Sequence, residues 1–124
     1  MKNFIITTGT EDDFFKRGRR IAKDLDAGRP IAKQTIISFE DPDDMMRLLS
    51  SARLNLFKEI KREPGSIARI AERIKRDRSA VKRDIDAMQA AGLVSVTEKT
   101  LPGHGRMKEV RAIADKISLQ VDVF

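Results

Sequence analysis

The chain has 124 residues, no cysteine and a formal net charge of +6, with a pI near 9.9. This length allows one modest core, the absence of thiols excludes disulfides and thiolate metal sites, and the basic charge favours an acidic partner such as nucleic acid or an anionic membrane. No apolar run reaches the roughly 20 residues that a membrane-spanning helix needs, so we expect a cytoplasmic location and no membrane partner.

The first 49 residues predict a strand, a helix, a second strand and a short helix. Residues 4–8 are a β-branched and aromatic run typical of a strand buried on both faces, and Thr10 is a suitable N-cap for a helix ending near residue 27. Along that helix, basic residues are expected to form a solvated face, and three apolar residues form a stripe at helical spacing: Phe14, Ile21 and Leu25. A second strand is expected at 35–39, and Asp41 with Pro42 begins the short helix.

Residues 50–113 predict three helices and a hairpin. The helices are expected at 51–62, 66–75 and 78–91. Ser66 and Asp77 are suitable N-caps, and Gly92 is suited to end the third helix in a left-handed conformation. Apolar residues at helical spacing form the inward stripes of the second and third helices: Ile67, Ile70, Ile74, Val81, Ile85 and Met88.

A basic hairpin is expected after the third helix. Its strands are predicted at 93–97 and 108–113, with a glycine-rich turn at 101–105. His104 is expected to be an exposed loop residue rather than a pH-sensitive contact. Three basic residues flank the turn: Lys99, Arg106 and Lys108.

The last residues, 117–123, alternate strictly between apolar and polar side chains, which predicts a half-buried strand. This strand could pair with the N-terminal strand or with another subunit. We therefore divide the chain into an extension at 1–49 for dimerisation or partner binding, a central domain at 50–113 and a C-terminal strand segment at 114–124. Residues 66–111 contain 11 Lys/Arg and 6 Asp/Glu, so the net charge is local to the central domain.

The central domain carries a family resemblance. The string IARIAERIKRDRSAVKRDIDAMQAAGLV, residues 67–94, combines an apolar helix, a short turn, a helix with a polar and basic first turn, and a closing Ala-Gly-Leu-Val. Together with the hairpin, it resembles the winged helix-turn-helix of MarR-like transcriptional regulators. The resemblance implies an α+β fold, a winged helix-turn-helix with an N-terminal strand–helix extension and a C-terminal strand, in a sequence-specific DNA-binding regulator that acts as a repressor.

The resemblance also implies which residues contact double-stranded DNA. Helix 78–91 would lie in the major groove, and the hairpin segment 98–108 would be a wing on the minor groove or backbone. Asp84 and Asp86 lie on that helix and are expected to form surface ion pairs. The implied DNA contacts are Ser66, Arg78, Ser79, Lys82, Arg83, Lys99, Arg106 and Lys108.

The flanks resemble compact prokaryotic DNA-binding proteins, some of them similar to antitoxins, more than MarR-like proteins with long dimerising helices. Two alternatives therefore stay open: an antitoxin-like protein that binds a small toxin and autoregulates its operon, and a winged-helix protein-interaction module. A homodimer is expected, because paired recognition helices match half-sites one helical turn apart. The sequence has no phosphate loop, nucleophile–base pair or convergent His/Cys ligands, so we expect no catalytic residues, no cofactor and no metal site.

Overall fold

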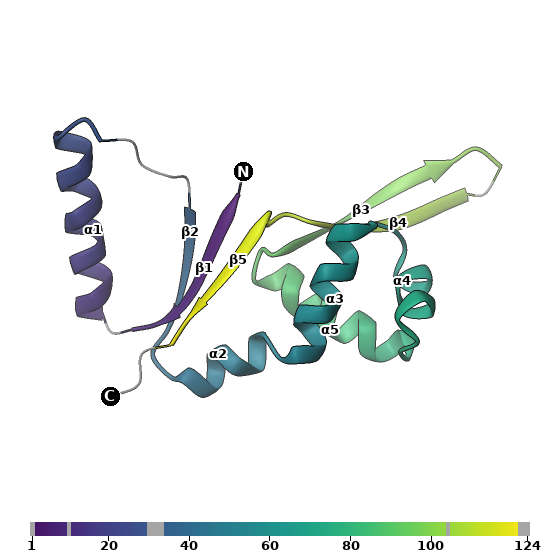
Figure 1. Cartoon of the computed structure of the whole chain (residues 1–124). Coiled ribbons are helices and arrows are strands. Elements are labelled where there is room, and N and C mark those ends of the chain that lie inside the picture. The colour runs from purple at the N-terminus through teal and green to yellow at the C-terminus, as the bar shows by residue number, and fades with distance from the viewer. Residues whose placement is uncertain (1, 10, 30–33, 104, 122–124) are drawn as a thin grey trace. The chain divides into compact units, whose positions relative to one another are not determined.

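The computed structural model describes residues 2–9, 11–29, 34–103 and 105–121. These residues form five helices and five strands, a mixed α+β arrangement that groups into two compact units (Figure 1). Unit 1 comprises residues 1–47 and 116–124, and unit 2 comprises residues 48–115. Within the described part, no helix is both long and apolar enough to cross a bilayer.

Unit 1 is built on a three-stranded parallel sheet. β1 (Asn3–Thr8) lies in the centre, with β2 (Gln34–Phe39) on one side and β5 (Lys116–Gln120) on the other. α1 (Glu11–Asp26) connects β1 to β2, and α2 (Pro42–Leu48) follows β2 and reaches the start of unit 2. The C-terminal strand therefore pairs with the N-terminal strand, one of the two pairings that the sequence leaves open.

The central strand of this sheet is the buried one. Phe4 and Ile6 are buried, and Ile6 is paired with Ile37 of β2 and with Leu119 of β5. No residue of β2 or β5 is fully buried in the described part of the chain. β5 ends at Gln120, earlier than the predicted end at 123, and the last three residues lie outside the described part.

The apolar stripe predicted on α1 is exposed. Ile21 is 39% and Leu25 63% exposed, and the neighbouring Phe15 is 53% exposed. The half-buried side chains of α1 are instead Arg17 and Asp24. Two residues of the prediction, the Phe14 side chain and the N-cap Thr10, lie outside the described part.

Unit 2 contains three helices and an antiparallel hairpin in the predicted order. The helices are α3 (Ser51–Arg62), α4 (Ile67–Ile74) and α5 (Arg78–Ala90). The hairpin strands are β3 (Val94–Leu101) and β4 (Gly105–Ala112). α3 and α5 begin at the predicted residues and α4 begins one residue later, at Ile67; each helix ends within one residue of its predicted end.

Local capping explains these boundaries. The side-chain oxygens of Ser50, Ser66 and Asp77 each accept a hydrogen bond from the backbone N–H three residues later, at 3.3, 3.2 and 3.2 Å. Gly92 ends the segment after α5 with a φ of 81°. α4 is capped by the following residue, Lys75, whose left-handed φ of 55° costs a non-glycine residue about 1–2 kcal/mol. This conformation allows the short turn that leads directly into α5.

The core of unit 2 joins all five of its elements. Fully buried apolar side chains come from α3, α4, α5, β3 with the residue before it, and β4: Leu56, Ile60, Ile70, Val81, Ile85, Met88, Leu93, Val94 and Val110. Each contributes about 1.5–3 kcal/mol relative to an exposed position. Ile67 and Ile74, predicted on the inward stripe of α4, are half-buried because they lie at its two ends.

The hairpin is longer than predicted. Its register runs from Val94 opposite Ala112 to Leu101 opposite Gly105, so the expected turn at 101–105 is reduced to three residues. Gly105 has a φ of 75°, which favours glycine at this reversal, and His104 lies outside the described part. The hairpin is attached to the loop before α4 through Gly65 and Val110, whose backbones exchange hydrogen bonds of 2.8 and 3.3 Å.

Candidate nucleic-acid interface

The first two turns of α5 expose the four residues predicted to read DNA. Val81 and Ile85 on the opposite side of the helix are fully buried, so packing determines which face turns outward. Residues four apart on a helix are neighbours, so the exposed residues form two adjacent pairs. The exposed residues are Arg78, Ser79, Lys82 and Arg83.

One of these four residues is ion-paired on the helix surface. Lys82 Nζ lies 2.8 Å from Asp86 Oδ2, and both side chains are more than half exposed. Such a pair contributes only about 0.3–0.5 kcal/mol, so a phosphate can compete for the lysine. Within the described residues, no carboxylate pairs with Arg78 or Arg83.

Asp84 has a structural role rather than the predicted surface pairing. Its side chain is only 14% exposed and accepts from Arg53 Nε at 3.0 Å and from Arg76 Nη2 at 2.8 Å. Burial disfavours the charged carboxylate, but these two hydrogen bonds outweigh burial and hold the pKa of Asp84 below its usual value. Asp84 therefore ties α5 to α3 and to the turn before α5, which holds the exposed face of α5 in place.

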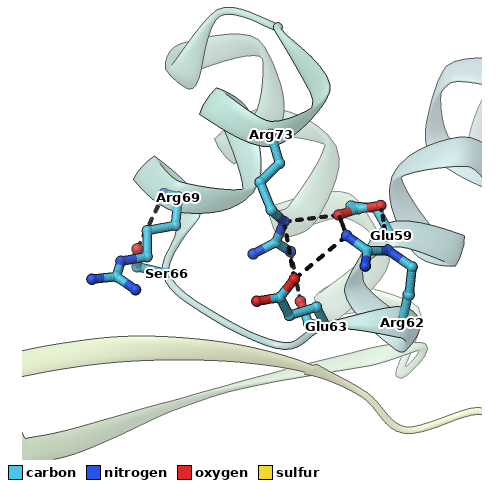
Figure 2. A network of polar contacts seen from close by, with 6 residues as sticks. All are labelled: Glu59, Arg62, Glu63, Ser66, Arg69 and Arg73. Atoms are coloured by element: carbon cyan, nitrogen blue, oxygen red, sulfur yellow. Dashed lines mark hydrogen bonds and ion pairs between the residues drawn. The ribbon is translucent and has the colours of Figure 1, made fainter.

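A second network ties α4 to the end of α3, as Figure 2 shows. Glu59 Oε1 lies 2.6 Å from Arg62 Nη2 and 2.8 Å from Arg73 Nε, and Arg73 also donates to the Glu63 carbonyl at 2.6 Å. The hydrogen bonds from Arg62 and Arg73 lower the pKa of Glu59 to about 2. Arg73 is therefore engaged within unit 2 and is not available for a ligand.

The first turn of α4 presents a cation that sequence reasoning did not select. Ser66, predicted to contact DNA, uses its hydroxyl as the N-cap acceptor for the Arg69 N–H. The Arg69 side chain is exposed and points away from the Glu59 network in Figure 2. Its position three residues after an N-cap serine was the available signal, because backbone and side-chain donors at a helix N-terminus suit a phosphate.

Two of the three basic residues predicted on the hairpin are paired with acids of the hairpin itself. Lys99 Nζ lies 3.0 Å from Glu109 Oε2, and Arg106 Nη1 lies 3.7 Å from Glu98 Oε2. The hydrogen bond from Lys99, with a further one from Arg111, lowers the pKa of Glu109 although burial opposes ionisation. Lys108 is exposed and has no ion pair within the described residues.

The ion pairs divide the basic residues of this region into two groups. Six of the 11 Lys/Arg in residues 66–111 pair with acids in the described structure: Arg73, Arg76, Lys82, Lys99, Arg106 and Arg111. The other five are exposed and have no carboxylate partner among the described residues: Arg69, Lys75, Arg78, Arg83 and Lys108. These five cations lie on α4, its following turn, α5 and β4, and are available to bind an anion.

A hollow connects α5 with the hairpin. It has a volume of about 330 Å³ and brings together two predicted site residues, Lys82 and Lys108. It also includes Gln89, an exposed amide on α5 that sequence reasoning missed. Glutamine can pair with an adenine edge, so this residue extends the candidate surface beyond the first two turns of α5. The remaining lining residues are Ile67, Asp86, Val96 and Glu98.

Comparison with known proteins finds similarity to solved structures and to one protein family, and no curated protein matches the chain. The structure, described as a “Possible transcriptional regulator from Methanosarcina mazei Go1”, is 20% identical, with a TM-score of 0.48 over 62% of this chain and 68% of that chain. The family model matches residues 48–119, more than half of the chain, which include all of unit 2 and most of β5. The chain therefore belongs to the HVO_A0114 family.

Proposed function

We propose that unit 2 is a winged helix-turn-helix that binds double-stranded DNA and that the protein is a sequence-specific transcriptional repressor. α4 and α5 form the helix-turn-helix, and α5 enters the major groove. The β3–β4 hairpin is the wing and lies on the minor groove or backbone. Arg78, Ser79 and Arg83 are the residues closest to the bases in this arrangement.

The observation that carries this proposal is the set of five unpaired, exposed cations in residues 66–111. When fixed cations without carboxylate partners neutralise DNA phosphates, the counterions condensed on the DNA are released. This release is a main source of affinity for DNA. Arg78 and Arg83 project from a helix whose opposite face is fully buried, which supports their use as directed contacts.

The pairing of the other cations supports a rigid reading surface. Arg53 and Arg76 hold Asp84 of α5, and Arg73 holds α4 against α3. The hairpin is fixed at its base through Gly65 and Val110. A reading helix and a wing that are held in this way lose little conformational freedom on binding, which favours affinity.

The test is the affinity of the full chain for the DNA upstream of its own gene and for a scrambled duplex, over a series of salt concentrations. We expect tighter binding to the upstream DNA, and a logarithm of affinity that falls linearly with the logarithm of salt for both. Equal affinity for both duplexes at every salt concentration would rule out sequence-specific regulation. Scrambled DNA that binds with no salt dependence would rule out the phosphate contacts.

A second function, binding of a small partner protein in the manner of an antitoxin, is favoured by the open edges of unit 1. Among the described residues, β2 and β5 each pair with β1 on one side only, so each leaves backbone donors and acceptors for an added strand. Purification from the native host should then recover a stoichiometric small protein. Repeated purification of the chain alone would contradict this function without affecting the DNA proposal.

A further inference from the structure

One face of α1 carries apolar side chains that are exposed in the described structure. Phe15, Ile21 and Leu25 are all exposed large apolar side chains on a single helix. Gly18 and Ala22 lie between them and are also exposed. Contiguous exposed apolar side chains of this kind mark an interaction surface.

The residues of this face are spaced along α1 like those in the contact between two packed helices. Gly18, Ile21 and Leu25 are separated by three and four residues, which is the repeat that two packed helices share, and Phe15 and Ala22 widen the stripe. Gly18 is destabilising inside a helix, and a Cβ at this position would meet nothing within 4 Å. Packing among the described residues therefore gives no reason for a glycine here, whereas a second helix packed on the stripe does.

The charges beside the stripe identify its partner. Arg17 and Asp24 are seven residues apart, so they lie on the same flank of the stripe. When two identical helices pack antiparallel about a two-fold axis, the same flanks meet, and Arg17 of one copy lies opposite Asp24 of the partner subunit. The symmetry repeats this contact, so two ion pairs form. In a parallel pair this flank meets the one that carries Phe15 and Ala22, and no ion pair forms.

We propose that α1 is a self-association site, in which two copies of this chain pack α1 against α1 in an antiparallel pair. In that register Gly18 admits Ile21 of the partner subunit, so a small residue lies opposite a large one in the seam. Asp24 is paired with Arg29 at 3.2 Å in the single chain, and this exposed contact is exchanged for Arg17 of the partner subunit. α1 carries five basic and five acidic residues, so net charge does not oppose association. The proposal does not depend on DNA binding.

The test is a reversal of charge in the full chain, measured by sedimentation equilibrium without DNA. The unaltered chain should pass from 14.0 kDa toward twice that mass as its concentration rises. Arg17→Asp and Asp24→Arg should each weaken association by about tenfold or more, because each replaces two attractive contacts with two repulsive ones. The double variant, Arg17→Asp with Asp24→Arg, should recover the affinity.

Two further variants serve as controls. Arg20→Asp makes the same charge change almost opposite the stripe and should leave association unchanged. Leu25→Asp should abolish association without loss of helix signal in circular dichroism, since Leu25 is exposed in the single chain. A chain that stays at 14.0 kDa at all concentrations, an association insensitive to Leu25→Asp, or a double variant that fails to recover would each overturn the proposal. DNA affinity is measured separately, on variants of unit 2. A failure of the self-association proposal can therefore be distinguished from a failure of the DNA-binding proposal.

Discussion

The two units of this protein use their apolar residues in opposite ways. Of the ten largest fully buried side chains in the described structure, only Ile6 belongs to unit 1. The large apolar side chains that are exposed in the described structure all belong to unit 1: Phe15, Ile21, Leu25, Met46, Leu119 and Val121. Unit 2 therefore has a core of its own, whereas unit 1 presents apolar surface that another molecule can cover.

The same division holds for charge. Residues 48–115 contain 15 Lys/Arg and 9 Asp/Glu, whereas the remainder of the chain contains ten of each. Unit 2 thus carries the entire net charge of +6, and unit 1 is neutral. The difference is in keeping with the two proposals, in which unit 2 attracts an anion and unit 1 associates through apolar contacts.

The largest expected effect is a loss of folding stability when a buried residue of unit 2 is truncated, compared with an exposed residue of unit 1. Leu56→Ala, at a position with no exposure, should lower the free energy of unfolding of unit 2 by about 2–5 kcal/mol, because it leaves a cavity. Leu25→Ala on α1 should change stability by less than about 0.5 kcal/mol at concentrations where the chain is monomeric. Urea denaturation followed by NMR signals of each unit measures both. Equal losses would contradict the contrast.

The next effect concerns the charge of unit 2. Arg78→Ala should weaken binding to the upstream DNA by about 1–3 kcal/mol, as expected for a directed base contact. Lys58→Ala removes another exposed cation, from α3, and serves as the matched control with little expected change. Fluorescence anisotropy titrations at one fixed salt concentration measure both variants. The proposed reading face is wrong if the two substitutions weaken binding equally.

A smaller effect tests the ties that hold α5. Asp84→Ala should destabilise unit 2 by about 1–2 kcal/mol, because Arg53 and Arg76 lose their shared acceptor in a partly buried site. Asp86→Ala breaks only the exposed pair with Lys82 and should cost less than about 0.5 kcal/mol. Thermal denaturation of the two variants provides the comparison, and a reversed order would show that Asp84 is not a structural residue.

The smallest effect is a pH dependence of the stability of unit 2. The pKa of Glu59 falls from 4.5 to about 2 on folding, so its charged form stabilises the fold at pH values above 4.5. This contribution should be lost as the pH falls from 4.5 toward 2. Glu59→Gln should therefore lower stability at neutral pH and flatten the decline over that range. Urea midpoints measured between pH 2 and 7 check this, and parallel curves for both proteins would contradict it.

The boundaries of α4 and α5 could be predicted because their determinants are local. Ser66 and Asp77 accept hydrogen bonds from residues three positions away, and Gly92 takes its left-handed conformation by itself. The residues of α5 that face outward in the candidate site could also be predicted, because the apolar residues recur at helical spacing on the opposite face. The hairpin length was predicted less well, because pairing beyond Thr97 depends on the opposite strand rather than on its own apolar pattern.

The roles of individual charged residues could not be predicted. Asp84 was expected at the surface, but its acceptor atoms are used by Arg53, 31 residues earlier in the chain. Lys99 and Arg106 were predicted to contact DNA, which stays a prediction; the sequence did not indicate that the hairpin register places Glu109 and Glu98 within reach of them. Arg69 was overlooked although it follows the N-cap Ser66 by three residues, because only the structure shows that Arg73, one turn later, is engaged by Glu59.

By itself, the sequence determined the helices of unit 2, the face that each turns inward and the region that carries the charge, because caps, helical periodicity and composition act over a few residues. Only the tertiary structure decided which five cations stay unpaired, that β5 joins β1 across most of the chain, and that the stripe of α1 is exposed. These features depend on residues far apart in sequence, whose contacts exist only once the chain has folded.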